Sequence, residues 1–485
     1  MSEALARLEP RSLWELFGKI AAIPRPSRHE ERIVAWVREL AREHGWGVRA
    51  DEIGNLVLEV PASAGREGAE VLILQAHLDM VCEKNRDVEH DFMTDPIRPR
   101  IEGDWVYATG TTLGADNGIG VAAALAVATD PAVVHGPLEL LMTLDEETGL
   151  NGAQGLDASM LRGRTMLNMD SEEDGKLFVG CAGGADCELW LEPARRPPAA
   201  GSRSLTLLVS GLRGGHSGLN IHENRGNALK LLTRLLQAAV ADGVEFEIAE
   251  LHGGSKHNAI PREAEATLTL LDGQEERLRG GVARMIECYR DELRGIDDGL
   301  QIVLEPAPTP ASVMQRSDGQ KLLNLLAALP HGVLGMSPAI PGLVETSNNL
   351  AAVERENGGA RILTSCRSSV DSTQQAVLCS IRAAGALAGA RIEEHGGYPG
   401  WKPDMDSAVL ATMRRVYAEV WGREPEVTAI HAGLECGLLG EKISGLDMIS
   451  FGPQIEGAHS PDERVQISSV GRFWEALVRV LRGPA

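Results

Sequence analysis

Apolar runs and amphipathic segments alternate along the first third of the chain. Ser27 and Glu30 stand three residues apart, as in a capping box, and apolar residues then recur at helical spacing. We therefore expect a helix capped by Ser27. Residues 118–128 are apolar nearly all round and predict a core helix. Strands are expected at residues 55–60, 71–75, 138–144 and 164–169. Together these elements indicate an α/β domain with a mostly parallel central sheet.

The pattern changes near Cys187 and changes back after His395. In between, strands with alternating apolar and polar positions accompany long helices; strands are expected at 187–192, 204–210, 244–250, 264–271 and 300–305, and helices at 226–241 and 275–293. After His395, helices are expected at 407–421 and 471–481. We therefore predict an α/β domain in two parts, residues 1–186 and 396–485, interrupted by an α+β domain of residues 187–395.

Charge and cysteine usage narrow the possible partners. The 485 residues include 47 Lys and Arg against 69 Asp and Glu, a formal charge of −22 that argues against nucleic acid as a partner. No apolar stretch is long enough for a bilayer and the first residues do not resemble a signal peptide, so we expect a cytoplasmic protein without membrane contact. The seven cysteines contain no CxxC pair, so any metal ligands should be His, Asp and Glu.

Acidic residues and histidines lie directly after the predicted strands and in two tight turns. The carboxyl ends of strands are where open α/β sheets bind ligands. Adjacent glutamates on an extended segment face opposite sides, so one can bind metal while the other stays free as a base. These candidates are His77, Asp79, Asp116, Glu146, Glu147, Asp170 and His459.

Each candidate has an ordinary explanation when taken alone. His77 could be a core histidine beside a surface aspartate, and Asp116 could cap the following helix. Glu146 and Glu147 could be an exposed acidic pair, and His459 an incidental loop residue. A dinuclear metal centre, however, needs a bridging carboxylate, terminal His and carboxylate ligands and a free glutamate, and the chain offers all of them in order.

Seven strings along the chain resemble those of M20 metallopeptidases of the peptidase D branch, the aminoacyl-histidine or cytosol non-specific dipeptidases. The resemblance runs from the N-terminal helices to the end of the chain and keeps the order of the motifs. The strings are LQAHLDMVCEKN, GTTLGADNGIGVA, LMTLDEETGLNGA, LNMDSEEDGKLFVGCAGG, GGHSGLNIHENRGNA, HAGLEC and GAHSPDERV.

The resemblance implies a zinc-peptidase-like catalytic domain with a lid and dimerisation domain at residues 187–395. In such a centre Asp116 bridges two divalent metal ions, expected to be Zn²⁺, with Mn²⁺ or Co²⁺ as alternatives. His77 and Asp170 would complete one site, and Glu147 and His459 the other. Asp79 would orient His77, and Glu146 would be the general base.

Four further residues are candidates for contacts to the substrate. His216 could stabilise the oxyanion, within its own chain or across a dimer interface, or could make only local contacts in its glycine-rich loop. Asn258 could bind the substrate backbone and Arg367 its carboxylate, for which a guanidinium fork is well shaped, although either could be an ordinary lid residue. Glu435 could receive the free amino terminus.

The implied activity is metal-dependent hydrolysis of unblocked dipeptides, including Xaa-His dipeptides. The partners expected are a small peptide substrate and a second copy of the chain, bound through the lid as a homodimer. An M20 deacylase acting on N-acylated amino acids is the alternative, since relatives share the metal site. A non-catalytic peptide-binding relative would lack a ligand or the base, and neither is missing.

Overall fold

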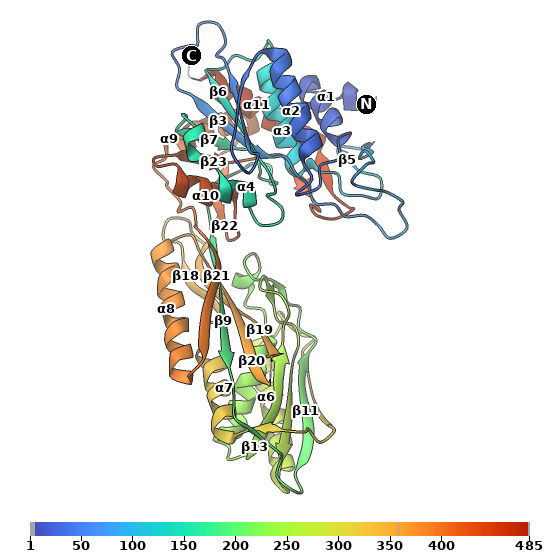
Figure 1. The fold of residues 1–485 in the computed structure, drawn as a ribbon, viewed down its shortest axis with the longest axis vertical. Helices are drawn as coiled ribbons and strands as arrows, with labels where there is room; N and C mark the ends of the chain where they lie inside the picture. Colours follow the sequence, from blue (N-terminus) through green and yellow to red (C-terminus); the bar gives the residue numbers. More distant parts are fainter. Residues whose placement is uncertain (1–4, 357, 484–485) are drawn as a thin grey trace. The chain divides into compact units, whose positions relative to one another are not determined.

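The computed structural model describes residues 5–356 and 358–483, and the chain folds into two compact units (Figure 1). The first unit contains Met1–Cys181, Trp401–Ala429 and Leu434–Ala485, and the second contains Ala182–Gly400 and Ile430–Gly433. The changes of pattern at Cys187 and His395 thus lie a few residues inside the second unit. The short return of Ile430–Gly433 to the second unit had no counterpart in the sequence pattern.

The first unit is built on an eight-stranded sheet in the order β1-β2-β6-β3-β7-β23-β8-β22. Its four central strands, β6, β3, β7 and β23, run parallel, and β1, β2 and β8 pair antiparallel towards the edges. The strand bounds are β1 Gly47–Ala50, β2 Leu56–Val60, β3 Leu72–His77, β6 Leu138–Thr143, β7 Thr165–Asn168, β8 Lys176–Cys181, β22 Glu426–Ile430 and β23 Asp447–Ser450. The predicted α/β class with a parallel centre is confirmed; β1, β8, β22 and β23 had not been located from the sequence.

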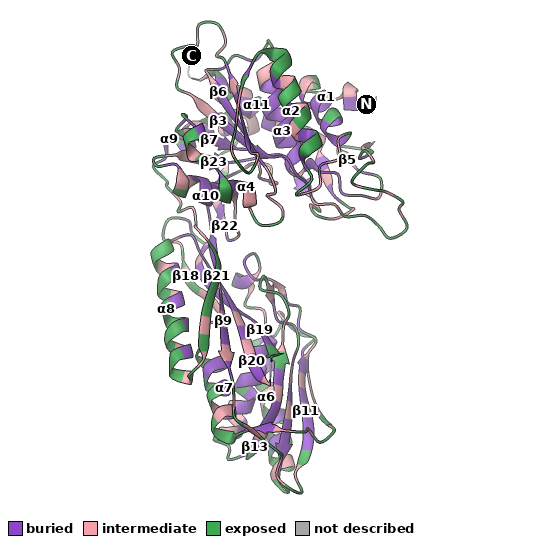
Figure 2. Cartoon of the chain, in the orientation of Figure 1, coloured by how far each residue is buried: buried purple, intermediate pink, exposed green. Residues whose placement is uncertain are grey.

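Helix α3, Ala115–Thr129, is the core helix that its uniformly apolar sequence predicted. It packs against α1, Arg11–Ala21, and against β3, and all its residues from Asn117 to Val127 are buried (Figure 2). Helices α9, Ala408–Trp421, and α11, Ile467–Arg482, contact each other, and α9 contacts β23. Smaller elements of this unit are η1 Leu5–Arg7, α4 Asn151–Gly155, η2 Ala158–Met160, α10 Glu435–Lys442 and a four-stranded sheet of β4 Arg100–Glu102, β5 Trp105–Tyr107, β24 Ile455–Glu456 and β25 Arg464–Gln466.

The predicted cap of the second helix is wrong. Helix α2 spans Glu31–His44, and its N-cap position is Glu30, whose side chain makes no capping hydrogen bond. Ser27 lies outside the helix, and its Oγ donates to Asp79 Oδ2 at 2.8 Å. A capping-box spacing is fulfilled by many loops, so the tertiary contact with Asp79 decided the conformation of this one. The helix ends at Gly45, which adopts the left-handed conformation.

The second unit contains a nine-stranded sheet whose registered pairs are all antiparallel. The order is β16-β11-β15-β13-β19-β20-β9-β21, with β18 also paired to β19. The strand bounds are β9 Gly183–Leu191, β11 Arg203–Ser210, β13 Phe246–Gly253, β15 Ala264–Leu270, β16 Gln301–Pro306, β18 Gly332–Met336, β19 Val344–Glu356, β20 Gly359–Ser368 and β21 Arg391–Tyr398. This antiparallel sheet with helices is the α+β domain that the change of pattern predicted.

Four helices pack on that sheet through one cluster of buried apolar residues. They are α5 Ala228–Ala241, α6 Gln274–Glu292, α7 Arg316–Ala328 and α8 Asp371–Ala388. The sequence located α5 and α6 but not α7, α8, β18, β19, β20 or β21. The remaining elements of this unit are β10 Arg195–Arg196, β12 Gly215–His216, η3 Ile221–Glu223, β14 Ala259–Ile260 and β17 Val313–Met314. Among the described residues of the whole chain, no helix is both long and apolar enough to cross a membrane.

Candidate metal centre

The predicted ligands of the first unit converge at one edge of its sheet. Strand β3 ends at His77, β6 leads after Thr143 into the loop of Glu147, and β7 leads after Asn168 to Asp170. Because β6, β3 and β7 are parallel neighbours, their carboxyl ends meet at the same edge. Asp116 reaches this edge from the first turn of α3.

His77, Asp116 and Asp170 form the first group of possible ligands. His77 Nε2 lies 3.1 Å from Asp116 Oδ1 and 3.2 Å from Asp170 Oδ1. Burial lowers the pKa of His77, but the carboxylates of Asp170 and Asp116 outweigh it and raise that pKa well above the ordinary value. Burial raises the pKa of Asp170 to about 6. This pocket therefore favours a positive charge at the imidazole nitrogen.

Asp116, Glu147 and His459 form the second group. His459 Nε2 lies 3.1 Å from Asp116 Oδ2 and 3.0 Å from Glu147 Oε2. Hydrogen bonds from His459 to the carboxylates of Asp116 and Glu147 raise the pKa of His459 to about 11. His459 sits in the left-handed backbone region, with φ of 64°, which agrees with the constrained turn expected around it. The two carboxylate oxygens of Asp116 thus face different groups, as a bridging ligand requires.

The donor set fits two divalent metal ions. Glu147 Oε1 is buried and has no hydrogen-bond partner among the described residues. A buried carboxylate oxygen in that condition is costly, and a cation held among the ligands of its group would satisfy it. In each group the ligand atoms lie within 4.8 Å of one another. Imidazole with carboxylate is a donor set that suits zinc and neighbouring divalent metals.

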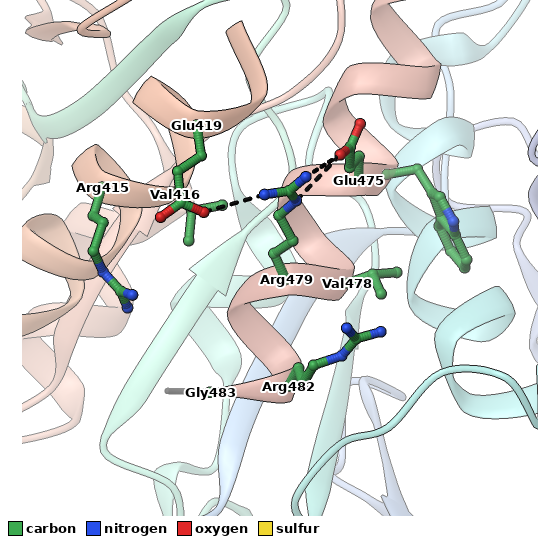
Figure 3. A pocket seen from close by; sticks show the side chains of 9 residues that line it. Arg415, Val416, Glu419, Glu475, Val478, Arg479, Arg482 and Gly483 are labelled. Carbon is green, nitrogen blue, oxygen red and sulfur yellow. Dashed lines mark hydrogen bonds and ion pairs between the residues drawn. The ribbon is translucent and has the colours of Figure 1, made fainter. Parts of the chain in front are cut away.

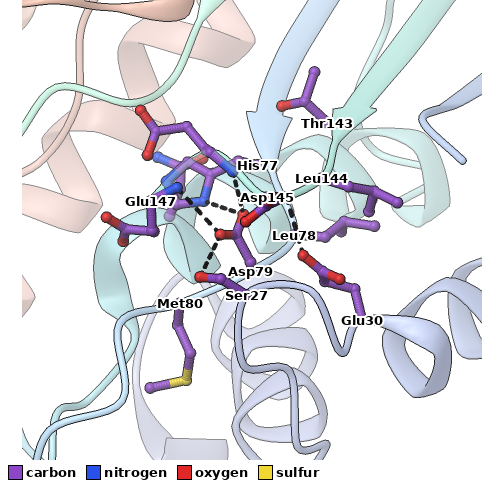
Figure 4. Close-up of polar contacts among 12 residues, drawn as sticks. Ser27, Glu30, His77, Leu78, Asp79, Met80, Thr143, Leu144, Asp145 and Glu147 are labelled. Atoms are coloured by element: carbon purple, nitrogen blue, oxygen red, sulfur yellow. Dashed lines mark hydrogen bonds and ion pairs between the residues drawn. The ribbon is translucent and has the colours of Figure 1, made fainter. Parts of the chain in front are cut away.

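Asp79 links the first ligand to the loop that carries the glutamates (Figure 4). Its Oδ1 lies 3.3 Å from His77 Nδ1, on the side of the ring that faces away from Asp116. Its two oxygens also accept the backbone N–H groups of Glu146 and Glu147, at 3.1 and 3.2 Å. Burial raises the pKa of Asp79, but the contacts with His77 and Ser27 prevail and lower it to about 2. A carboxylate in this position orients the imidazole and fixes its tautomer.

Glu146 lies beside both groups without being needed by either. One of its oxygens is within 4.8 Å of ligand atoms of His77 and Glu147. Burial raises its pKa well above the ordinary value, and the carboxylates of Asp170, Glu435 and Glu147 add to this effect. A carboxylate whose pKa is raised in this way accepts a proton more readily than a free glutamate does.

Glu435 is fully buried in the same unit, at the first residue of α10. Its Oε2 accepts hydrogen bonds from Gln75 Nε2 at 2.6 Å and Thr143 Oγ1 at 2.8 Å. Its Oε1 has no partner among the described residues. Burial raises its pKa to about 7. Glu435 is therefore more fully buried than we expected for a residue that contacts the substrate.

The other predicted contact residues form a cluster of their own in the second unit. His216 Cε1 and Arg367 Cδ both lie within 3.3 Å of where a Cβ on Gly218 would stand, so both side chains surround that glycine. Burial lowers the pKa of His216 to about 4, and the charge of Arg367 adds to the effect. Arg367 is buried and its Nη1 donates to Tyr398 Oη at 3.1 Å. Asn258 is exposed and accepts Ser217 N–H through its backbone carbonyl at 2.8 Å.

The hydrogen bonds of His216 define which ring nitrogen carries the proton. Its Nδ1 accepts the backbone N–H groups of Gly218, at 3.2 Å, and Leu219, at 3.0 Å. A nitrogen that accepts two hydrogen bonds is unprotonated, so the neutral ring carries its proton on Nε2. His216 therefore presents a neutral N–H donor at its far side.

Three residues near these sites had not been singled out from the sequence. Arg25 and Glu463 contact the backbone next to the ligands of the first unit, and His431 lies close to Arg367 in the second. Glu463 lies inside the string GAHSPDERV and His431 begins HAGLEC, so both belong to the strings that resemble M20 metallopeptidases. Arg25 lies in Ile23-Pro24-Arg25-Pro26-Ser27, and the only signal in the sequence was a charged residue between two prolines.

A surface hollow of about 600 Å³ between α9 and α11 has a different character (Figure 3). None of the predicted site residues lines it. Its Arg479 is already paired with Glu419 at 3.1 Å and with Glu475. The hollow is lined by three arginines and two glutamates, and it contains none of the groups of described side chains that could hold a metal ion together.

Known proteins resemble the chain over its full length. It is 43% identical over 482 residues to the cytosol non-specific dipeptidase of Escherichia coli K12, covering 99% of both chains. The crystal structure of aminoacylhistidine dipeptidase from Vibrio alginolyticus matches with a TM-score of 0.94 and 43% identity, over 100% of this chain and 99% of that one.

A more distant structure shares the fold. An aminopeptidase from Bacillus cereus matches with a TM-score of 0.57 at 16% identity, over 98% of each chain. Residues 73–483 match the family model described as peptidase family M20/M25/M40. That span contains all the residues proposed above as metal ligands. With this match and the 43% identity to a full-length relative, the chain belongs to peptidase family M20/M25/M40.

Proposed function

We propose that this chain is a metal-dependent dipeptidase that hydrolyses unblocked dipeptides, including Xaa-His dipeptides, with Glu146 as the general base. One observation carries the proposal: two groups of possible ligands share Asp116, and the half-buried Glu146 lies beside them. The two full-length relatives bear names of dipeptidases, which favours this activity over deacylation of N-acylated amino acids.

Each residue of the centre has a separate task in the proposed reaction. His77 and Asp170 would hold one metal ion, Glu147 and His459 would hold the other, and Asp116 would contribute an oxygen to each group. When bound, two such ions lower the pKa of a shared water and polarise the scissile carbonyl. Glu146 takes a proton from the water as it attacks and delivers that proton to the leaving amine. Asp79 keeps the ring of His77 in its ligating orientation.

The second unit supplies groups for the substrate. His216 donates from Nε2 to the developing oxyanion, a role supported by its neutral state and by the two N–H groups that fix its tautomer. Arg367 binds the dipeptide carboxylate, and Asn258 binds its backbone. Glu435 of the first unit receives the free amino terminus at its unpartnered Oε1. We further propose that the metal is Zn²⁺, that the protein works in the cytosol as its E. coli relative is named to do, and that it forms a homodimer through the second unit.

The test is the release of free amino acids from matched substrates. One Xaa-His dipeptide and one dipeptide without His are each supplied unblocked, N-acetylated and C-amidated. The protein is assayed after chelation and after addition of Zn²⁺, Mn²⁺ or Co²⁺. We expect metal to restore cleavage of the unblocked dipeptides, and we expect no cleavage of the N-acetylated ones. The amides should lose about 10- to 100-fold in kcat/KM, because Arg367 then lacks its charged partner.

Each blocked series addresses one residue. Cleavage confined to N-acetylated substrates would make the protein a deacylase and refute the role of Glu435. Equal rates for acids and amides would refute the role of Arg367. Full activity after exhaustive chelation would refute the metal centre itself.

A further inference from the structure

Arg25 is a buried cation that binds two loops at the metal centre. It is 2% exposed, although it carries a guanidinium group. Its Nη1 donates to the carbonyl oxygens of Leu78, at 2.9 Å, and Asp79, at 2.5 Å. Its Nη2 donates to the carbonyl oxygen of Gly114. Arg25 thus joins the end of β3, next to His77, to the turn that carries Asp116.

Glu463 is a buried anion on the other side of that turn. It is 2% exposed and accepts four consecutive backbone N–H groups, those of Leu113, Gly114, Ala115 and Asp116, at 2.7, 2.9, 2.7 and 3.3 Å. These N–H groups lie at the amino end of α3, where they lack partners inside the helix. Glu463 follows His459 by four residues, so it joins the loop of His459 to the backbone of Asp116.

A single peptide group lies between the two buried charges. The carbonyl oxygen of Gly114 accepts from Arg25, and the N–H of the same peptide group, that of Ala115, donates to Glu463. Glycine is required here for a steric reason as well. A Cβ on Gly114, whose φ is +68°, would stand 2.6 Å from Arg25 Nη2, and a Cβ on Gly118 would stand 2.8 Å from it. The glycines around Asp116 therefore make room for the guanidinium group.

We propose that Arg25 and Glu463 are positioning residues that hold the backbone of Asp116 from both sides, and so fix its two carboxylate oxygens between the two metal groups. Neither side chain is a ligand in the two groups that share Asp116. Both act through the backbone, one towards His77 and the other towards His459. The effect of these two residues on metal binding rests on the function proposed above. Their contacts with the backbone of Asp116 do not depend on that function.

The proposal predicts that replacing Glu463 weakens metal binding more than it lowers the global stability of the protein. In Glu463→Gln the new amide keeps one oxygen, but its NH₂ group faces backbone N–H groups that need an acceptor. Asp116 then loses its fixed place, and we expect the affinity for metal to fall about 10- to 100-fold, as is typical when a group that supports a ligand is replaced. Arg25→Lys keeps the charge but not the fork and should weaken metal binding in the same direction.

Glu139 provides a matched control in the same unit. It is also fully buried, and it accepts backbone N–H groups of Arg162, at 2.9 Å, and Gly163, at 3.0 Å. It stands at the start of β6, whereas the ligands gather at the carboxyl end. Glu139→Gln should lower the melting temperature and leave the affinity for metal unchanged.

The experiment has two readouts on full-length protein. Hydrogen exchange of the metal-free protein measures protection of the amides from Leu113 to Asp116, and competition with a chelator measures the affinity for Zn²⁺. We expect Glu463→Gln to lose protection in that segment and affinity for Zn²⁺, and Glu139→Gln to lose neither. Glu463→Asp, which keeps the carboxylate, should recover part of both.

Three results would overturn the proposal: unchanged exchange in Glu463→Gln, unchanged affinity in that variant, or an equal loss of affinity in Glu139→Gln. Failure of the proposed function looks different. The unsubstituted protein would then bind no metal or cleave no dipeptide. Hydrogen exchange would still test whether Glu463 holds the backbone from Leu113 to Asp116, and loss of protection in Glu463→Gln would support that part of the proposal. The part in which this contact positions metal ligands would be refuted.

Discussion

His77 and His459 of the first unit lie in electrostatic surroundings opposite to those of His216 and His431 in the second unit. In the first unit, His77 Nε2 and His459 Nε2 each lie within 3.2 Å of two carboxylates, and both pKa values are raised. In the second unit, burial and the charge of Arg367 lower the pKa of His216 to about 4 and that of His431 to about 3. The same residue type is therefore prepared for cations in one unit and kept neutral in the other.

This difference separates ligands from hydrogen-bond donors. A histidine among carboxylates sits where positive charge is stabilised, as a metal ligand must. A histidine near an arginine with Nδ1 occupied, as in His216, remains an uncharged donor at neutral pH. An uncharged donor close to Arg367 suits a substrate that brings a carboxylate and develops an oxyanion. Variants in the first unit should therefore affect metal or proton transfer, and variants in the second unit should affect neither.

The largest effect is expected for Glu146→Gln, which removes the proposed base from the first unit without removing a ligand. We expect kcat to fall by about 10²- to 10⁴-fold, since this is what a positioned base contributes. Two metal ions per chain should remain bound, as measured by elemental analysis beside the Glu139→Gln control. A metal-replete Glu146→Gln protein with near-normal kcat would refute the assignment of the base.

The sequence was informative where strand order alone brings residues together. His77, Glu147 and Asp170 each follow an apolar strand, and parallel neighbours necessarily place such residues at one edge. The motifs then supplied Asp116 and His459, which come from a helix start and a distant loop. Strands β19 and β20 escaped notice because their buried stretches include polar residues such as Asn348, Asn349 and Arg367, which interrupt an apolar pattern.

Residues that act through the backbone could not be predicted. The contacts of Arg25 and Glu463 go to main-chain groups, which every residue has, so no pairing of side chains announces them. The prediction that Ser27 caps a helix was wrong for a related reason. Its local spacing fitted a cap, while its partner, Asp79, lies 52 residues away in the sequence. Local patterns carry no information on contacts of that range.

A smaller effect is expected for His216→Ala, because it removes one donor to the oxyanion. We expect kcat to fall by about 10²- to 10³-fold, with the affinity for metal unchanged. Loss of metal from His216→Ala would break the division between the two units.

The same variant shows whether His216 serves its own chain or the partner. Glu146→Gln and His216→Ala proteins are each nearly inactive, and they are mixed under conditions that exchange subunits. If His216 acts across a dimer interface, about a quarter of the sites regain both groups, since half of the dimers are mixed and one of their two sites is complete. If His216 acts within its own chain, mixing restores nothing.

The smallest effect, and the one that tests the electrostatic contrast most directly, is on stability against pH. His431 is buried, its Nε2 lies 2.7 Å from Ser347 Oγ, and its pKa is lowered from 6.5 to about 3. Between these values the unfolded chain binds a proton that the folded chain does not, so stability is full above pH 6.5 and is lost as pH falls towards 3. His431→Gln should remove up to about 1.4 kcal/mol per pH unit from that slope, measured by urea unfolding of the metal-free protein.

His459→Gln should change the slope with the opposite sign, because a raised pKa gives stability that is present below pH 6.5 and lost as pH rises towards 11. Slopes that change in the same direction in both variants would show that the histidines of the two units do not differ in the way their contacts indicate.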